Sequence, residues 1–364
     1  MNFKVTIIIL NWNGWEDTIE CMKSLKQINY PNYDVIIVDN GSHDDSVEKI
    51  RHYCNAESKT LNYFEYKENE VVNDEDNYKS SNVIFIKNHE NYGFAEGNNV
   101  GIRFALKYLK PYYVLLLNND TAVDKYFLDK LVLNCKNDKK IALCQSKLLK
   151  YEDHNIIDST GGILDKYGFG ISRGSDEKDI GKYDKNLKEG FFYVLGTCMF
   201  ISVEFINKAD PDEFLDSLIF AVHDDVDVSW YARILGYEVA YCPDSLCYHK
   251  QHKSFKKKPS DLVSFLLFKN SIRILIKYYS MKNLIFYLPL KLAFEFVLSF
   301  GGMFVNRDSS NLKSFIKAFI WNIKHLNNTN NKRKEIQSKR KVKDSEILKF
   351  MEKESLKIRN LQKN

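Results

Sequence analysis

The sequence lacks the features by which several classes of protein are usually identified. Its 364 residues contain seven cysteines, an odd number, and no two of them form a Cys-x-x-Cys pair. Scattered cysteines of this kind predict reduced thiols in a cytosolic compartment and not a disulfide framework. The formal net charge is only +5, and so small an excess does not by itself indicate binding to nucleic acid. No internal repeat is present.

The start of the sequence does not match a secretory signal. The apolar run at residues 5–10 is too short for the apolar core of a signal peptide, and no cleavage site of small residues follows it. The run is rich in β-branched residues and has no polar alternation. We therefore expect it to form a strand that is buried on both faces.

Three more apolar runs predict buried strands, and segments with helical spacing separate them. The strands are expected at 34–39, 83–88 and 113–118, and the helices at 15–25, 46–53 and 92–109. Strands that alternate with helices favour a parallel α/β sheet. Ser42, with Asp45 three residues later, predicts a capping box for the second helix. The polar residues 55–82 predict an inserted surface loop.

The rest of the chain changes character twice. A glycine-rich loop is expected at 159–170, a strand broken by Gly196 at 192–202, and an acidic corner, a helix and a strand within 216–243. From about residue 260 the sequence is strongly apolar, and its end is rich in Lys and Arg. We therefore divide the chain into a catalytic domain (1–255), an apolar helical region (256–330) and a basic helical tail (331–364).

Two of the predicted strands end on an acidic residue. Asp39 closes the second strand, and Asp120 follows the fourth strand after two asparagines. In an open parallel sheet, ligands bind at the carboxyl ends of the strands. A carboxylate there can hold a ribose hydroxyl or a hard cation such as Mg²⁺ or Mn²⁺. A single Asp in this place is more often a turn residue or a helix cap, but two of them favour a nucleotide-diphosphate site.

Six motifs, in order, carry a family resemblance. They are "TIIILNWNG", "IIVDNGSHDDS", "NHENYGFAEGNNVGI", "YVLLLNNDT", "GTCMFIS" and "HDDVDVSWYARILGYEVAYCP". Over residues 3–255 the sequence resembles the inverting, GT-A-fold glycosyltransferases of the large family two, especially their bacterial rhamnosyltransferase-like branch. The resemblance implies a mostly parallel Rossmann-like sheet with flanking helices and transfer from a nucleotide diphosphate sugar.

The resemblance also assigns residues to the sugar nucleotide. It implies that Asn11, at the end of the first strand, and Asp39 contact the nucleoside. It places Asn91, Gly93 and Asn98 in a turn that lies against the nucleotide and the sugar.

The same resemblance assigns a divalent cation to the fourth strand end. Asp120 matches the last acid of the family's Asp-x-Asp motif, whereas Asn118 replaces the first, which leaves one protein carboxylate there. A late histidine, His249, would join Asp120 at the metal, although an exposed His in a basic loop is an equal alternative. Gly196 belongs to the segment that lies under the sugar and the acceptor.

The acidic corner holds three aspartates. By themselves, Asp224, Asp225 and Asp227 could serve only to cap the following helix. The resemblance makes Asp225 the general base, with Asp224 where the family usually has Glu, and leaves Asp227 to orient the loop or cap the helix. Arg233 is expected to pair with these acids or with phosphate, or to lie on the surface.

Two other functions remain open at this stage. A nucleotidyltransferase normally has a Gly-Gly-x-Gly-x-Arg type of loop after its first strand, and "NWNGWEDT" is not one. A non-catalytic sugar-nucleotide or glycan-binding protein of the same fold predicts loss of the acids, which are present. The main prediction is therefore a metal-dependent hexosyltransferase acting on a surface-glycan or lipid-linked acceptor.

The apolar region predicts contact with a membrane. Residues 284–304 have the length of a span, but Pro289, Lys291 and Glu295 interrupt them, which favours a helix lying in the interface. A helix packed on the catalytic domain is the alternative. Basic segments at 254–259 and 331–343 would favour an anionic leaflet. We expect a cytoplasmic protein, peripheral on the inner face of the cell membrane. The last helix could instead form a homo-oligomer contact.

Overall fold

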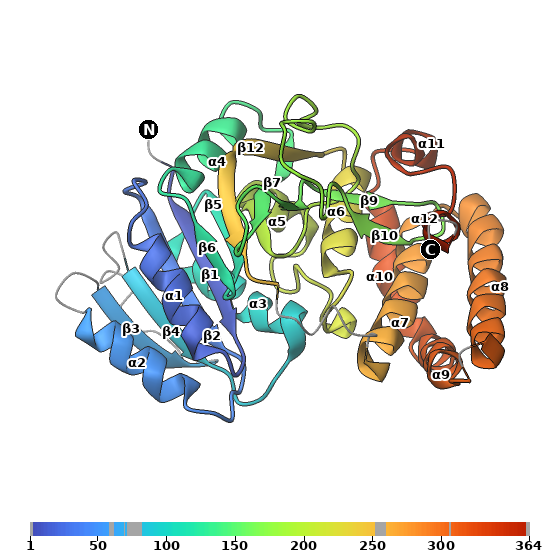
Figure 1. Ribbon diagram of the computed structural model, residues 1–364, viewed down its shortest axis with the longest axis horizontal. Helices are drawn as coiled ribbons and strands as arrows, with labels where there is room; N and C mark the ends of the chain where they lie inside the picture. The colour runs from blue at the N-terminus through green and yellow to red at the C-terminus, as the bar shows by residue number, and fades with distance from the viewer. Residues whose placement is uncertain are drawn as a thin grey trace.

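A central sheet with helices on both faces forms most of the molecule (Figure 1). The computed structural model describes residues 3–57, 62–68, 70, 82–251, 260–305 and 307–361. In these residues the sheet has ten strands in the order β3-β4-β2-β1-β5-β11-β7-β12-β6, with β8 paired to β7. The five strands from β3 to β5 in this order are parallel, β11 is antiparallel to both of its neighbours, and β9 and β10 form a separate hairpin.

The strands have these bounds: β1 Val5–Asn11, β2 Tyr33–Asp39, β3 Asn62–Lys67, β4 Asn82–Lys87, β5 Tyr113–Asn118, β6 Thr121–Val123, β7 Ile141–Lys150, β8 Ile157–Ser159, β9 Gly162–Leu164, β10 Gly170–Ser172, β11 Cys198–Ser202 and β12 Glu238–His249. The helices around the sheet are α1 Trp15–Leu25, α2 Ser46–Ala56, α3 Gly93–Phe104, α4 Phe127–Cys135, α5 Val203–Ala209 and α6 Asp224–Ile234. The C-terminal helices are α7 Asp261–Tyr278, α8 Met281–Val305, α9 Ser310–Lys324, α10 Leu326–Ser338, α11 Asp344–Ile347 and α12 Leu356–Leu361.

Both faces of the sheet are buried, as the apolar runs predict. Ile8 of β1 packs in a core with residues of α3, α5 and α6. Its neighbours Ile7 and Ile9 point to the opposite face and pack with residues of α1, α2 and α4. Because side chains alternate along a strand, an uninterrupted apolar run fills both cores at once. The α/β fold with a mostly parallel sheet and a C-terminal helical region is confirmed.

Three local predictions are wrong. The capping box is absent, because the Ser42 hydroxyl donates to the Asp39 carboxylate and α2 begins only at Ser46. The expected loop at 55–82 contains β3, an edge strand that pairs with β4. The glycine-rich segment at 159–170 contains β9, whose partner β10 begins at Gly170.

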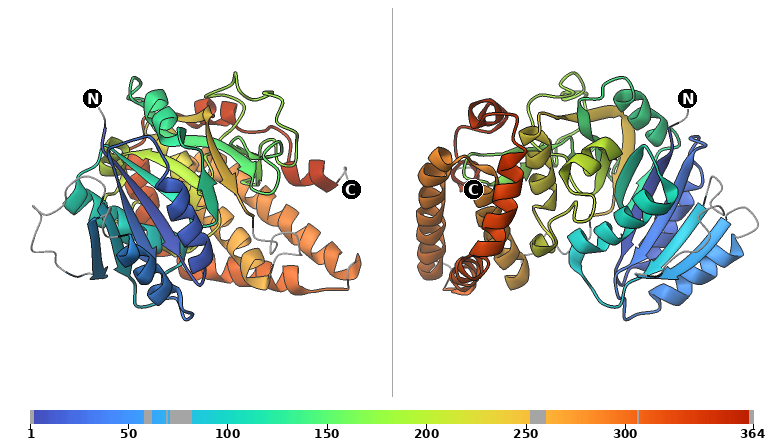
Figure 2. Two further views of the ribbon diagram at one scale, coloured as in Figure 1. Left: turned by 60° about the vertical axis from the view of Figure 1, so that its left-hand side comes forward. Right: turned by 180° about the vertical axis from the view of Figure 1, so that it is seen from behind.

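The C-terminal helices lie beside the sheet domain, and α8 and α9 are the farthest from it (Figures 1 and 2). Apolar side chains cover their outward faces and are exposed: Ile285, Phe286, Leu290, Phe296, Val297, Phe300 and Phe304 on α8, and Ile316, Phe319, Ile320 and Ile323 on α9. Of the described helices, only α8 has the length and composition of a membrane span, which alone is weak evidence for one.

The two charges in the middle of α8 do not interrupt this outward face. Lys291 and Glu295 are buried against the protein, and their side chains pair at 2.8 Å. Several basic residues after residue 330 also form ion pairs within the protein. Lys332 pairs with Asp210 and Glu213, and Arg340 pairs with Asp344. The other basic segment, residues 254–259, lies outside the described residues.

Candidate active site

The carboxyl ends of three neighbouring strands meet at one edge of the sheet. Asn11 of β1 lies opposite Asp39 of β2, and Leu10 lies opposite Asn118 of β5. The Asp39 carboxylate is buried and accepts hydrogen bonds from the Asn11 amide at 2.8 Å and the Ser42 hydroxyl at 2.6 Å. These bonds fix the carboxylate at the point where the sequence predicts a nucleoside.

Asn40 is a structural residue of this edge that the sequence analysis missed. Its amide donates to the Asn91 side chain at 2.9 Å and to the Gly93 carbonyl at 3.0 Å. Its carbonyl accepts from the Asn88 amide at 3.0 Å and the Tyr92 backbone N–H at 3.2 Å. Asn40 therefore joins the end of β2 to the predicted donor turn. Its position directly after a strand-end Asp is the signal that could have identified it.

The turn that opens α3 also contacts the loop before α6. Gly93 has a φ of +76°, and a Cβ atom there would lie 2.5 Å from Phe220. Only glycine satisfies both the backbone angle and the close approach. Two residues further along, the Ala95 N–H donates a hydrogen bond to the Phe220 carbonyl at 3.0 Å. The Asn98 side chain is buried and donates to the Phe94 carbonyl at 2.8 Å, so its amide stabilises the first turn of α3.

Asp120 and His249 come together, as the sequence predicts. The His249 Nε2 atom lies 3.3 Å from the Asp120 carboxylate, and its Nδ1 atom lies 2.8 Å from Asp158, a partner that the sequence analysis missed. Burial lowers the pKa of His249, but the hydrogen bonds to Asp120 and Asp158 outweigh this effect and raise that pKa to about 10. His252 lies outside the described residues.

This pair of side chains fits a cation only in part. Within the described residues, no group of three or more His, Cys, Asp or Glu side chains could hold a metal ion. Asp120 and His249 offer an oxygen and a nitrogen ligand, and Asp158 is placed to orient the imidazole from its other nitrogen. An incomplete set of this kind suits a metal that shares its coordination with substrate phosphates.

The acidic residues of α6 have three different environments. Asp225 is half-buried, and its carboxylate accepts hydrogen bonds from the backbone N–H groups of Val226 and Gly196. Burial raises its pKa to about 6, against the lowering effect of these bonds. Asp224 is buried, and burial together with the charge of Asp225 raises its pKa well above the usual range. Both shifts disfavour the charged form of the carboxyl group, and a pKa of about 6 leaves Asp225 ionised near neutral pH.

One of the two roles predicted for Asp227, and all of those predicted for Arg233 within the protein, differ from what the structure shows. Asp227 does not act as a helix cap, because it forms a buried ion pair at 2.6 Å with Lys277 of α7. Arg233 is neither paired with the acids nor exposed. It is buried and donates to the carbonyls of Phe192 and Phe191 at 2.9 and 3.2 Å.

The loop before α6 is held in an unusual backbone conformation by α7. Phe220, Val222 and His223 all have φ between +66° and +68°, a region that is costly for residues with a Cβ atom. The Asn270 amide of α7 donates to three carbonyls around this loop, those of Ile219, Ala221 and Val222, at 3.1, 2.8 and 2.6 Å. The sequence analysis missed Asn270, since it lies in an apolar helix.

Gly196 connects the two halves of the site. A Cβ atom on Gly196 would lie 3.1 Å from the Asp224 carboxylate and 3.2 Å from the Phe94 ring. The adjacent Thr197 carbonyl accepts a hydrogen bond from the Asn118 N–H at 2.9 Å. The structure therefore brings the strand ends, the 91–98 turn and the acidic helix together around one short segment.

The sheet and its polar strand ends define an α/β protein of the GT-A type. The chain belongs to glycosyl transferase family 2, whose family model matches residues 6–208. Asp224 and Asp225 lie beyond the matched residues. No curated protein matches the chain.

Two of the solved structures that share the fold are proteins solved with Mn²⁺. A mannosyltransferase from Pyrobaculum calidifontis, solved with GDP-Man and Mn²⁺, has a TM-score of 0.51 at 12% identity, and the match covers 89% of this chain and 88% of that one. GalNAc-T7, solved with UDP, GalNAc and Mn²⁺, has a TM-score of 0.56 at 14% identity, and the match covers 88% of this chain and 57% of that one. At these identities the likeness shows the fold alone.

Proposed function

We propose that the protein is a metal-dependent inverting glycosyltransferase. It moves a hexose or deoxyhexose, with rhamnose as one candidate, from a nucleotide diphosphate sugar to a surface-glycan or lipid-linked acceptor. The observation that carries the proposal is the environment of Asp225. A general base should be ionised near neutral pH and still basic, and a pKa of about 6 meets both conditions.

Asp225 would take the proton of the acceptor hydroxyl. As that oxygen attacks the anomeric carbon, the bond from this carbon to the diphosphate oxygen breaks, and the electron pair leaves with the nucleoside diphosphate. The N–H groups of Gly196 and Val226 hold the carboxylate in a fixed orientation during this step. The raised pKa of Asp224 disfavours a second negative charge beside the base.

Asp120 and His249 would hold a divalent cation. When bound, Mg²⁺ or Mn²⁺ stabilises the negative charge that develops on a diphosphate leaving group. The neutral form of His249 is the one that ligates metal, so binding would release its proton. The two structures of the same fold that contain Mn²⁺ support this part of the proposal.

The exposed faces of α8 and α9 support a location at a membrane. Exposed apolar surfaces mark interaction sites, and these side chains belong to α8 and α9, two helices that contact each other. Figure 2 shows the two helices at the edge of the molecule. We place the protein on the cytoplasmic side of the cell membrane, with these faces in the interface of an anionic leaflet.

A thermal-shift panel tests the donor half of the proposal. UDP-, dTDP- and GDP-sugars are added to the purified protein with Mn²⁺. A ligand at 100 times its dissociation constant stabilises the folded state by about 2.7 kcal/mol, so the true donor stands out. The Asp120→Ala variant should fold normally and lose the metal-dependent part of the shift. A wild-type shift that is the same with and without EDTA would remove the metal from the proposal.

A further inference from the structure

The loop before α6, residues 218–223, lies between the 91–98 turn and the proposed base. Its Phe220 carbonyl accepts the hydrogen bond from the Ala95 N–H of that turn, and its last residue directly precedes Asp224 and Asp225. The path of this loop therefore relates the position of the base to the turn that the sequence predicts at the donor sugar.

The backbone of the loop is strained at three of its residues. Phe220, Val222 and His223 have φ of +66°, +68° and +67°. Val222 is the clearest case, because a β-branched residue is a genuine outlier in this region. Strained angles of this kind persist only where the surrounding structure enforces them, so contacts from outside the loop must hold it.

Side chains of α7 bind most of the carbonyl groups in this loop. Four of the six carbonyls accept a hydrogen bond from Lys269 or Asn270, namely those of Leu218, Ile219, Ala221 and Val222. The other two accept from backbone N–H groups of α3 and α6. The Ala221 and Val222 carbonyls lie inside the strained stretch, and both are bound by Asn270.

The chemistry of the contact fixes the orientation of the Asn270 amide. The residue is fully buried, and its two N–H bonds serve three carbonyls, so one of them is shared. Its Oδ1 atom has no hydrogen-bond partner among the described residues. The reversed amide would turn this oxygen toward the carbonyl oxygens, which would repel it. The loop therefore needs the N–H groups, which neither an apolar residue nor an aspartate can supply.

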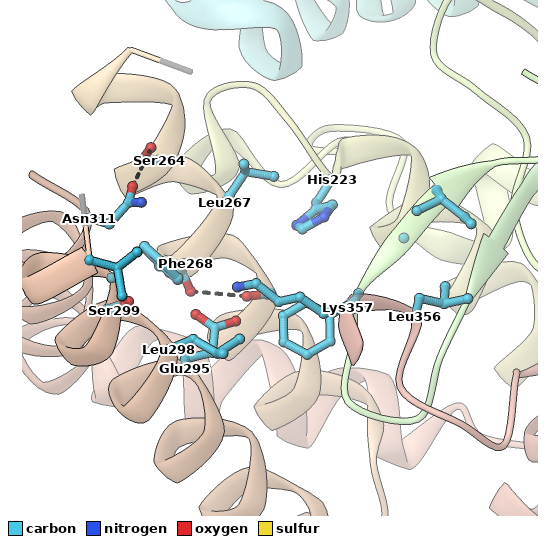
Figure 3. A pocket seen from close by; sticks show the side chains of 16 residues that line it. His223, Ser264, Leu267, Phe268, Glu295, Leu298, Ser299, Asn311, Leu356 and Lys357 are labelled. Carbon is cyan, nitrogen blue, oxygen red and sulfur yellow. Dashed lines mark hydrogen bonds between the residues drawn. The ribbon is translucent and has the colours of Figure 1, made fainter. Parts of the chain in front are cut away.

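The His223 side chain does not supply the same restraint. His223 occupies the N-cap position of α6 but makes no side-chain capping bond, and its Nδ1 atom has no partner in the part of the chain that the structure describes. The residue lines a pocket of about 710 Å³ together with Leu267 and Phe268 of α7 (Figure 3). The end of the loop thus borders a pocket, and the bonds from α7 are what restrains its carbonyls.

We propose that Asn270 is a positioning residue for transfer, which holds the loop before α6 in the strained conformation that places Asp225 beside the donor sugar. The inference rests on the proposed function and adds a residue that acts only through the loop. A misplacement of a catalytic group by about 1 Å can cost about 10²-fold in rate, so even a small relaxation of the loop should be visible in kcat.

Asn270→Leu in the full chain tests the proposal, because leucine has a similar volume and no N–H group. The kcat for transfer should fall at least about tenfold. The KM for the donor should stay nearly unchanged, since the bond between Ala95 and Phe220 does not involve Asn270. An unchanged kcat in this variant would overturn the proposal.

Asn322→Leu is the matched control. Asn322 of α9 is also a buried asparagine, its amide donates to the carbonyls of Lys269 and Ala318, and its Oδ1 atom has no partner among the described residues. Both variants should lower the urea midpoint, but only Asn270→Leu should lower kcat. An equal loss of kcat in the two variants would show a general effect of helix packing and contradict the proposal.

A double-mutant cycle separates positioning from stability. Glycine adopts positive φ readily, so Val222→Gly relieves part of the strain that Asn270 opposes. The loss of kcat caused by Asn270→Leu should therefore be smaller in the Val222→Gly background than in the wild-type background. Equal losses in both backgrounds would mean that Asn270 does not act through the strained loop.

Hydrogen exchange follows the loop without any transfer reaction. Amides in residues 217–227 should exchange at least about tenfold faster in Asn270→Leu than in wild type or Asn322→Leu, because local opening becomes easier. Wild-type transfer with an unchanged kcat in Asn270→Leu overturns this inference and leaves the proposed function standing. If the wild type itself transfers no sugar, the proposed function is wrong. Faster exchange in Asn270→Leu alone would then still support its hold on the loop, and unchanged exchange would overturn that as well.

Discussion

The two sides of the candidate active site are held together by different chemistry. On the strand-end side, neutral amides connect the segments, with Asn40 as the residue that contacts most of them. On the α6 side, buried charges do so. Asp216, 6% exposed, pairs with Arg273 at 2.8 Å and Lys277 at 2.7 Å, and Lys277 also pairs with Asp227.

This difference has energetic consequences. A neutral amide that loses a partner costs about 1–3 kcal/mol, whereas one charge left alone in the interior costs about 3–5 kcal/mol. The amide contacts of the strand-end side should therefore tolerate substitution better than the buried charges of the α6 side. The α6 side also depends on α7, since Arg273 and Lys277 both belong to that helix.

The largest expected effect is on transfer rate. Asp225→Asn keeps the shape of the side chain and removes its basicity, so transfer should fall at least about 10²-fold while donor binding stays nearly unchanged. The comparison is Asp224→Asn, which should cost less because Asp224 is buried and is not the proposed base. Steady-state transfer rates measure both. Near wild-type transfer by Asp225→Asn, or greater damage by Asp224→Asn, would show that the base is misassigned.

The next effect is on stability. Arg273→Met leaves the Asp216 charge without one of its two buried partners, and it should lower the free energy of unfolding by about 3–5 kcal/mol. Lys208→Met breaks the exposed ion pair with Glu204 and should cost at most about 1 kcal/mol. Urea denaturation of the two variants measures the difference. Similar midpoints would mean that the buried network does not stabilise the α6 side.

A smaller loss of stability is expected on the strand-end side. Asn40→Ala removes four hydrogen bonds and leaves buried groups unpaired, so unfolding free energy should fall by about 1–3 kcal/mol, with weaker donor binding. Asn137→Ala, at an exposed site, is the control. Urea denaturation and donor titration measure the two effects. A loss as large as that of Arg273→Met would erase the contrast between the two sides.

The smallest expected effect is that of pH. The ionised form of Asp225 is the active one, so transfer should be constant above about pH 7 and decline as the pH falls through 6. One unit below this pKa, at pH 5, the rate should be about tenfold lower. Asp224, the Asp227–Lys277 pair and Tyr193 are the titratable groups around it. Donor binding, followed separately, should change less over this range. A flat rate profile would contradict the assignment.

Several parts of the fold could be predicted because short stretches of sequence determine them. The apolar runs of β1, β2, β4 and β5 fill cores on both faces of the sheet, and the strand-end positions of Asp39 and Asp120 follow from the ends of those runs. The edge strand β3 has no such run, since its side chains are only partly buried. Its position depends on pairing with β4, which local sequence does not specify.

The missed residues act between distant segments. Asp158 reaches His249 across 91 positions, and Asn270 reaches the loop before α6 across about 50. Spacing within one motif carries no information about such contacts. Lys291 and Glu295 are a different case, because residues four apart share one face of a helix. Their spacing alone indicates that one face of α8 can stay free of both charges.

The clamp formed by Asn270 gives α7 a mechanical role. Asn270 donates to three carbonyls of the loop before α6 and so fixes the path of that loop. Its neighbour Lys269 also donates to the Ile219 carbonyl. A helix is stiff along its axis, so a displacement of α7 would carry with it the loop that precedes Asp225.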